Sequence, residues 1–134
     1  MTRPEICVGA VVVDDDRLLM IRRGHGPAAG EWSIPGGRVE RGELMVEAVV
    51  REVTEETGLD VVVDDYIGYV ERISEDAHFV IHDFHATAFT IEPVIAGDDA
   101  AEARWVDLSA VAELNLVEGL AEFLADHHVI PLIT

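Results

Sequence analysis

Three glutamates on one predicted helix are spaced so that they could share a metal ion. Glu52, Glu55 and Glu56 lie in residues 44–57, a stretch without glycine or proline that ends at Gly58, as is typical of a helix with a glycine C-cap. At about 100° per residue, the three side chains fall on one arc of that helix. Their negative charges repel one another, whereas a divalent cation such as Mg²⁺, which prefers oxygen ligands, would turn that repulsion into binding. The spacing therefore predicts a cation site on one flank of the helix.

An acidic helix face also has a simpler explanation, because most charge runs on helices are only solvated. The acidic arc here adjoins an aliphatic arc that consists of Met45, Val46, Val49, Val50, Val53 and Thr57. We expect this aliphatic arc to be buried, and we expect Ala48, inside the acidic arc, to leave room above it. A loop with glycines and two arginines, residues 36–43, comes directly before the helix. These features favour a binding site over a solvated face.

Arg51 is spaced to act on these acids. It stands four residues before Glu55 and four residues after Glu47, a separation that brings side chains together on a helix. We therefore expect Arg51 to orient the carboxylate of Glu55.

The elements that must position this helix follow from hydrophobic patterning. Apolar and β-branched runs predict strands, and a pattern with helical period near the end of the chain predicts a second helix that stops at Pro131. We expect Ser109 to cap a turn or short helix just after the last strand. The order strand, strand, helix, strands, helix is typical of an α/β/α sandwich with a mixed β-sheet between helices. The predicted strands are residues 6–13, 18–23, 61–63, 66–73, 78–91 and 102–107, and the second helix is residues 117–128.

The composition of the chain limits the kinds of molecule that it is expected to bind. The chain has 134 residues, 49% of them hydrophobic, and a net charge of -18, and its nine basic residues are all arginine. Such a charge argues against binding a nucleic-acid polymer or an anionic membrane. Its one cysteine, Cys7, lies in an apolar run and is expected to be a buried free thiol. The N-terminal residues lack a signal-peptide pattern, so we expect a cytoplasmic protein.

The sequence between residues 37 and 59 resembles the signature of the Nudix hydrolases. That signature is G-x5-E-x7-R-E-U-x-E-E-x-G-U, in which U is a bulky aliphatic residue. The positions that match it are Gly37, Glu43, Arg51, Glu52, Val53, Glu55, Glu56, Gly58 and Leu59. Every constrained position is met, which makes the resemblance specific. It implies a single Nudix domain over residues 1–134 with an α/β/α sandwich fold, and dimers are common in the family.

The resemblance also implies a reaction. Nudix enzymes use Mg²⁺ or Mn²⁺ to hydrolyse a diphosphate linked to another moiety. The implied metal ligands are the carboxylates of Glu52, Glu55 and Glu56 and the backbone carbonyl of Gly37. The cation would neutralise the diphosphate and make a water molecule easier to deprotonate. The arginines that could contact substrate phosphates are Arg22, Arg23, Arg38 and Arg41.

The general base has two candidate locations in the family. Some members use a glutamate of the motif, here Glu55, and others use an acid in the loop after the long strand. That loop offers Asp98, Asp99 and Glu102, and the spacing to the tryptophan that follows favours Asp99. The same acids could instead form a plain solvated loop. The candidate catalytic residues are therefore Glu55, Asp99 and Arg51.

Substrate choice is suggested by residues outside the motif. The run from residue 78 to residue 108 is similar to a branch of small Nudix proteins described as ADP-ribose pyrophosphatase-like. That similarity implies a nucleoside diphosphate derivative as substrate, with ADP-ribose cleaved to AMP and ribose 5-phosphate. The alternative is a MutT-like enzyme acting on oxidised nucleoside triphosphates. A third possibility is a Nudix domain that senses nucleotides without hydrolysing them.

Overall fold

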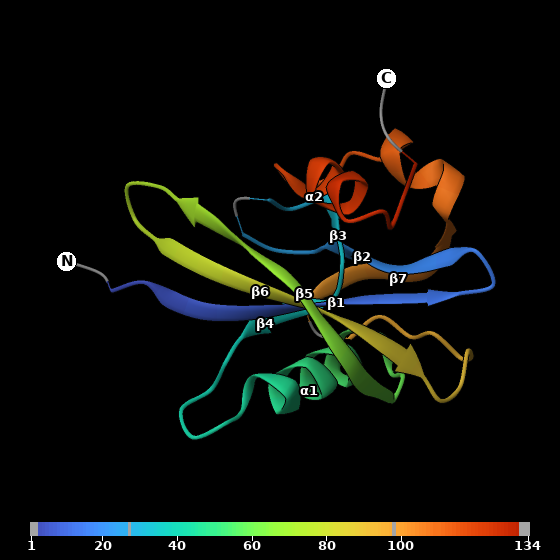
Figure 1. The fold of residues 1–134 in the computed structure, drawn as a ribbon, viewed down its shortest axis with the longest axis horizontal. Coiled ribbons are helices and arrows are strands. Elements are labelled where there is room, and N and C mark those ends of the chain that lie inside the picture. The colour runs from blue at the N-terminus through green and yellow to red at the C-terminus, as the bar shows by residue number, and fades with distance from the viewer. Residues whose placement is uncertain (1–2, 27, 98, 132–134) are drawn as a thin grey trace.

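A seven-stranded mixed sheet lies between one helix on its lower face and a pair of short helices on its upper face (Figure 1). The computed structural model describes residues 3–26, 28–97 and 99–131. Its elements in chain order are β1 (Glu5–Asp14), β2 (Arg17–Arg23), β3 (Trp32–Ser33), β4 (Gly36–Arg38), α1 (Met45–Thr57), β5 (Val61–Ile73), β6 (His78–Ala88), β7 (Ala100–Asp107), η1 (Leu108–Glu113) and α2 (Leu120–Asp126). The α/β/α sandwich expected from the sequence is confirmed.

The sheet is mixed because one of its strand pairs is parallel. β1 and β6 run parallel, in a register that extends from Glu5 opposite Phe79 to Val12 opposite Ala86. The other pairs are antiparallel, and the strand order is β3-β2-β1-β6-β5, with β4 also paired to β1 and β7 to β2. β1 therefore joins the half of the sheet that carries β5 and β6 to the half that carries β2 and β7.

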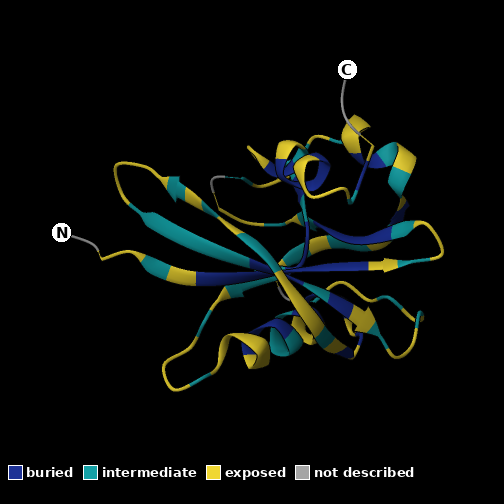
Figure 2. Cartoon of the chain, viewed as in Figure 1, coloured by how far each residue is buried: buried dark blue, intermediate teal, exposed yellow. Residues whose placement is uncertain are grey.

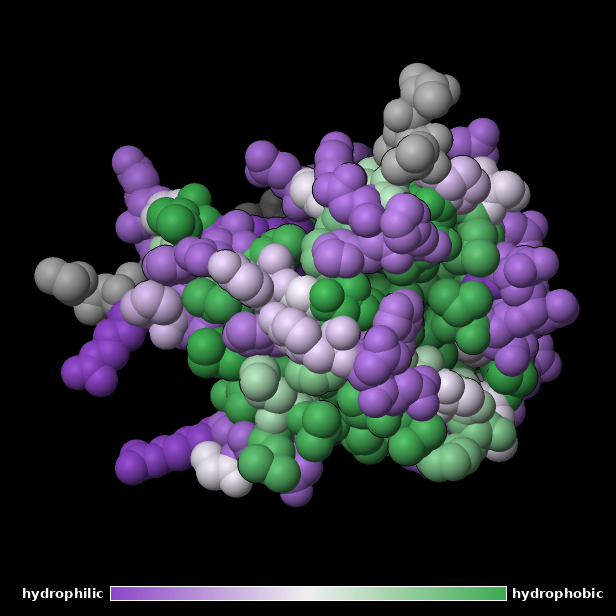
Figure 3. All heavy atoms as spheres, in the orientation of Figure 1, coloured by the Kyte–Doolittle hydropathy of each residue, from purple (hydrophilic) through white to green (hydrophobic). Residues whose placement is uncertain are grey.

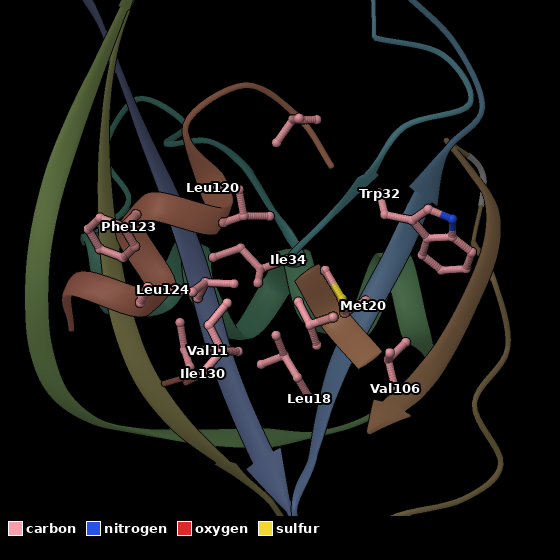
Figure 4. Close-up of a cluster of buried hydrophobic side chains, with 13 residues drawn as sticks. Val11, Leu18, Met20, Trp32, Ile34, Val106, Leu120, Phe123, Leu124 and Ile130 are labelled. Atoms are coloured by element: carbon pink, nitrogen blue, oxygen red, sulfur yellow. The ribbon is translucent and has the colours of Figure 1, made fainter. Parts of the chain in front are cut away.

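β1 supplies side chains to two hydrophobic cores, because successive residues of a strand point to opposite faces. Val8, Ala10 and Val12 belong to the core under α1, which also contains Val49 and Val53 of that helix. Val11 points the other way, into the core that α2 covers (Figure 4). Figure 2 shows burial concentrated along β1 and on the sheet-facing sides of the helices. Cys7 is buried as a free thiol, as expected.

Helix α1 is rotated from the orientation that its sequence predicts. Ala48 is 0% exposed and packs in the core, so it does not leave room above the acidic arc. Met45 and Val46, which were expected to be buried, are exposed. The buried residues of α1 are Ala48, Val49, Val53, Glu56 and Thr57. The expectation for Ala48 was wrong because α1 packs against β1, β4, β5 and β7 with the flank that carries Ala48 and Glu56 toward the sheet.

Several predicted boundaries and one predicted cap also differ from the structure, and the strands predicted at residues 61–63 and 66–73 form the single strand β5. The long strand β6 ends at Ala88 rather than at residue 91, and β7 begins at Ala100, two residues earlier than expected. The 3-10 helix η1 follows Asp107 and has no side-chain cap, so the predicted capping by Ser109 is wrong. Helix α2 ends at Asp126, so Pro131 does not terminate it.

Apolar side chains remain on part of the surface. Figure 3 shows them gathered over α1 and the adjoining ends of β5 and β6. The exposed apolar residues in this region include Met45, Val46, Val62 and Phe89. Within the described residues, no helix is both long enough and apolar enough to cross a membrane.

Candidate metal and catalytic site

The three glutamates are fixed by a helix whose ends are both hydrogen-bonded. The backbone N–H of Leu44, just before α1, donates to Oε1 of Glu47 over 2.8 Å. At the other end Gly58 adopts a left-handed conformation with φ of 76°, and its N–H donates to the carbonyl of Thr54 over 2.9 Å. The predicted glycine cap is therefore confirmed. Glu52, Glu55 and Glu56 lie on the last two turns of this rigid segment.

Glu56 is a buried carboxylate aimed at the sheet. It is 8% exposed, and its Oε1 accepts a hydrogen bond of 2.7 Å from the backbone N–H of Gly36. Burial raises the pKa of Glu56 to about 8, and the negative charges of Glu52 and Asp99 add to that rise, whereas the Gly36 bond and the charge of Arg23 oppose it. Removal from water and neighbouring negative charge both disfavour the ionised form. A divalent cation beside Glu56 would favour its ionised form.

Glu52 is held between the glycine strand β4 and Arg51. A Cβ atom on Gly37 would lie 2.6 Å from the Glu52 carboxyl carbon, so this carboxylate occupies space that only glycine leaves open. Burial raises the pKa of Glu52, and the hydrogen bond from Arg51 opposes that rise. Gly37, the first motif glycine, thus lies close beside Glu52, the first of the three glutamates predicted as ligands.

Arg51 connects the carboxylates of the motif. Its Nε and Nη2 donate to the two oxygens of Glu43 over 2.7 and 3.0 Å, a bidentate pair. Its Nη1 donates to Glu52 over 2.7 Å and to Glu55 over 3.2 Å. The hydrogen bond from Arg51 is the main reason that the pKa of Glu43 is lowered to about 2. Glu43 therefore anchors the guanidinium, and the guanidinium orients Glu52 and Glu55, as the i,i+4 spacing of Arg51 and Glu55 predicted.

The loop before β7 completes an acid-lined cleft. The cleft has a volume of about 320 Å³ and is lined by Glu52, Glu55, Glu56, Gly97 and Asp99. The structure thus brings Asp99 together with the helix glutamates. Glu102 lies on β7, outside this lining, and forms ion pairs of 3.6 Å with Arg22 and with Arg104. Asp98, the remaining candidate base, lies outside the described residues.

The four candidate phosphate-binding arginines have different surroundings. Arg23 is exposed, and its charge acts on Glu56 in the cleft. Arg22 is paired with Glu102, and Arg38 is paired with Glu5 over 2.9 Å. Arg38 also lies over the ring of Phe79, 5.6 Å from its centre. Arg41 is exposed in the loop before α1. Of these four arginines, Arg23 is the one whose positive charge lowers the pKa of Glu56 in the acidic cleft.

A larger groove on the opposite flank of α1 has a different character. It has a volume of about 600 Å³ and a mainly aliphatic lining. The residues that line it are Val46, Glu47, Val50, Arg51, Val61, Val62, Val63 and Phe89. Such a lining does not offer the several oxygen ligands that a magnesium or manganese ion takes. The smaller, acidic cleft is therefore the candidate site.

The acids of the cleft fit a hard divalent cation. Carboxylate oxygens are the ligands that Mg²⁺ takes in proteins. Across residues 3–26, 28–97 and 99–131, however, no three His, Cys, Asp or Glu side chains already converge closely enough to hold one ion. Glu52 and Glu55 instead contact the guanidinium of Arg51, and the side chain of Glu55, which is 58% exposed, lines the cleft. Arg51 bonds to one oxygen of each carboxylate, Oε1 of Glu52 and Oε2 of Glu55, so a cation could bind through the other oxygens.

Two backbone contributions to the site were not anticipated from the sequence. Gly36 donates its N–H to Glu56, and Gly97 lines the cleft from the loop before β7. Gly36 was treated only as a residue that breaks regular structure, and Gly97 only as part of a loop. The only sequence signal for Gly97 was its place directly before two acids, Asp98 and Asp99.

The fold and the cleft define an α/β/α domain with an acidic cleft at the end of one helix. The model of the NUDIX domain family matches residues 3–127. This chain belongs to the Nudix hydrolase family.

Known proteins similar to this chain are named for different substrates. It is 37% identical over 113 residues to a protein of Methanocaldococcus jannaschii named ADP-ribose pyrophosphatase, covering 83% of this chain and 66% of that protein. It is 34% identical to the oxidized purine nucleoside triphosphate hydrolase of Danio rerio, covering 75% of this chain and 65% of that protein. The chain thus spans about two thirds of the length of both relatives. A crystal structure of a MutT protein from Methanosarcina mazei Go1 superposes with a TM-score of 0.84 at 27% identity and covers 96% of each chain.

Proposed function

We propose that this protein hydrolyses the pyrophosphate linkage of a nucleoside diphosphate derivative, and that ADP-ribose is cleaved to AMP and ribose 5-phosphate. The observation that carries the proposal is the cleft in which four acids, Glu52, Glu55, Glu56 and Asp99, line one space. A pyrophosphate is itself anionic, so a cleft of this charge can accept it only together with cations. The name of the relative from Methanocaldococcus jannaschii supports ADP-ribose as the first substrate to test.

Four groups are proposed to hold the cation. They are the carboxylates of Glu52, Glu55 and Glu56 and the backbone carbonyl of Gly37. When bound, Mg²⁺ or Mn²⁺ supplies positive charge for the pyrophosphate oxygens and makes a water molecule easier to deprotonate. Arg51 keeps Glu52 and Glu55 turned toward one another, and its own position is fixed by Glu43. Arg51 is thus proposed as a positioning residue.

The proton of the attacking water needs an acceptor at the cleft. Asp99 and Glu55 are the two candidates, because both line the space and neither is buried. Arg23, whose charge acts on Glu56, is proposed to contact a substrate phosphate. Arg22 and Arg38 would have to leave their acidic partners, Glu102 and Glu5, to do the same.

The second candidate function is MutT-like hydrolysis of oxidised nucleoside triphosphates. Its support is the relative from Danio rerio, which is named for that activity and is 34% identical to this chain. Both reactions use the same cleft and differ in what lies beyond the pyrophosphate. A non-catalytic nucleotide sensor is less favoured, because the motif glutamates are all present.

The test is a substrate panel assayed with Mg²⁺ and with Mn²⁺. It contains ADP-ribose, nucleotide sugars, nucleoside triphosphates and 8-oxo-dGTP. We expect the largest kcat/KM for ADP-ribose, with AMP and ribose 5-phosphate as products. The Glu55→Gln variant should lose roughly 100-fold or more, because a positioned acid or base contributes about 10²–10⁴-fold.

A matched control lies on the same helix. Glu47→Gln keeps an oxygen that can accept from the N–H of Leu44, and Glu47 borders the aliphatic groove rather than the acidic cleft. It should leave kcat/KM unchanged. Cleavage of 8-oxo-dGTP in preference to ADP-ribose would favour the MutT-like function, and a wild-type protein that cleaves no compound of the panel would contradict both.

A further inference from the structure

The loop that precedes β7 is attached to the last turn of α1 by two backbone hydrogen bonds. The N–H of Ile95 donates to the carbonyl of Thr57 over 2.9 Å, and the N–H of Gly97 donates to the carbonyl of Glu56 over 3.1 Å. The last four carbonyls of a helix have no partner within the helix. The loop therefore supplies donors that the end of α1 needs, at the turn that carries Glu55 and Glu56.

Gly97 comes closer to the helix than any residue with a side chain could. A Cβ atom at this position would overlap the carbonyl oxygen of Glu55, and it would lie 2.8 Å from the Glu55 carbonyl carbon and 3.3 Å from the Cα of Glu56. These neighbours are backbone atoms of a regular helix, so no side-chain rotation can make room. A side chain at position 97 would have to lift the loop away from α1.

A second contact attaches the other end of this loop. The N–H of Gly24, which follows β2, donates to the carbonyl of Asp99 over 3.0 Å, and the N–H of Ala100 donates to the carbonyl of Gly97 over 3.2 Å. The backbone around Asp99 is thus held on one side by α1 and on the other by the end of β2. Asp99 lines the cleft from this position, and its charge contributes to the raised pKa of Glu56.

We propose that Gly97 is a positioning residue for catalysis, and that its close contact with α1 holds Asp99 at the cleft formed by the helix glutamates. The inference rests on the proposed hydrolase function and adds a residue outside the Nudix signature to it. In this arrangement the acids of the helix and the acid of the loop are aligned by backbone contact. The acids therefore do not need to contact each other directly, and such contact would be opposed by their like charges.

The first experiment is a double-mutant cycle with Gly97→Ala and Asp99→Asn, assayed with ADP-ribose and Mg²⁺. Gly97→Ala should lower kcat by roughly 100-fold, since a misplacement of about 1 Å in an active site can cost that much. KM should change little, because the phosphate-binding side chains are untouched. In the Asp99→Asn background, Gly97→Ala should have little further effect, since residues that act through one another are not additive.

Independent effects would overturn the proposal. If the two losses multiply, or if Gly97→Ala keeps the wild-type kcat, Gly97 does not act through Asp99. The control is Ile95→Ala in the same loop, because the Ile95 side chain is 62% exposed and the variant keeps the N–H that bonds to Thr57. This control should keep the wild-type kcat.

A second variant covers the case in which Gly97→Ala does not fold. Gly24→Ala would place a Cβ atom 3.1 Å from the carbonyl oxygen of Asp99, a tight contact on the opposite side of the loop. Gly24→Ala should lower kcat by a smaller factor than Gly97→Ala does. In the Asp99→Asn background it should leave kcat unchanged. A wild-type kcat for folded Gly24→Ala would count against the proposal.

Amide hydrogen exchange separates this inference from the proposed function. In Gly97→Ala the amide of Ile95 should exchange faster than in the wild type, because the loop leaves α1. If the wild type has no hydrolase activity, the proposed function fails while exchange still reports whether Gly97 holds the loop. Unchanged exchange at Ile95 would show that it does not.

Discussion

Two carboxylates are buried on opposite faces of the sheet, and their surroundings differ. Glu56 faces the sheet from α1, is 8% exposed and accepts a hydrogen bond from Gly36. Asp83 lies on β6 next to Phe84, which packs in the core under α1, so Asp83 points to the other face. It is 3% exposed, and its Oδ1 has no hydrogen-bond partner among the described residues. Burial raises the pKa of both side chains, to about 8 for Glu56 and to about 7 for Asp83.

The comparison teaches that a raised pKa alone does not identify a catalytic site. Desolvation is the main cause in both places. What separates them is their neighbours. Glu56 borders a cleft with Glu52 and Asp99, whose charges raise its pKa further. Asp83 is influenced by the positive charge of Arg72, which lowers its pKa, and it occupies space beside Gly9 that a Cβ atom would fill. Only Glu56 is surrounded by groups that could share a cation with it.

Replacing the carboxyl group of Glu56 should have the largest effect on activity. Removing a group that only orients a metal ligand typically lowers metal affinity or activity by about 10–100-fold. Glu56 is itself a proposed ligand, so Glu56→Gln should lower kcat/KM by at least about 100-fold. The glutamine still offers an oxygen to the N–H of Gly36, so the fold should persist. Asp83→Asn, measured in the same assay, should keep the wild-type kcat/KM. A large loss for Asp83→Asn would remove the distinction drawn between the two sites.

Metal binding should stabilise the protein through the cleft that contains Glu56 and not through Asp83. At a cation concentration of 100 times Kd, binding to the folded state should raise the free energy of unfolding by about 2.7 kcal/mol. Thermal and denaturant unfolding with and without Mn²⁺ would measure this increment. Glu56→Gln should abolish most of it, and Asp83→Asn should leave it intact. An equal increment in wild type and Glu56→Gln would show that the cation binds elsewhere.

The effect of Asp83 should be confined to the pH dependence of stability. Its pKa is about 7 when folded and about 3.9 when unfolded, so between those values the folded state holds a proton that the unfolded state has released. Stability from this group is complete below about pH 4 and declines as pH rises to 7, by up to about 1.4 kcal/mol per pH unit.

Asp83→Asn tests that sign by removing the titration. Relative to the wild type, the variant should gain stability from pH 4 to pH 7 and show a constant difference above pH 7. Urea unfolding at each pH in the absence of metal would provide the free energies. A difference that does not vary with pH would mean that the pKa of Asp83 is the same in the folded and the unfolded protein.

Much of the fold was predictable because local signals agreed with the tertiary structure. The helix cap at Gly58 and the strands around β1 and β2 follow from glycine chemistry and from apolar runs. The i,i+4 spacing on the predicted helix indicated that Arg51 and Glu55 would meet. These features depend on contacts close in sequence or on strongly patterned segments.

The features that were not predicted depend on tertiary contacts, which the periodicity of the sequence does not indicate. The rotation that buries Ala48 accompanies packing of α1 against β1, β4 and β5, and β4 is a three-residue strand without an apolar pattern. The second helix was predicted to begin at residue 117, but α2 begins at Leu120 because Gly119 takes a left-handed conformation with φ of 83°. The contact of Gly97 with α1 joins residues about forty positions apart, which no local pattern encodes.

The alternation of β1 has a consequence for how this chain can vary in length. Its even-numbered residues Val8, Ala10 and Val12 fill one core, while Gly9 and Val11 face the other. Inserting or deleting a single residue in the middle of this strand would exchange the two sets at once, because a shift of one position moves every following side chain to the opposite face. Evolutionary or engineered length changes should therefore collect in the hairpin tips and the loops, and β1 should keep its register.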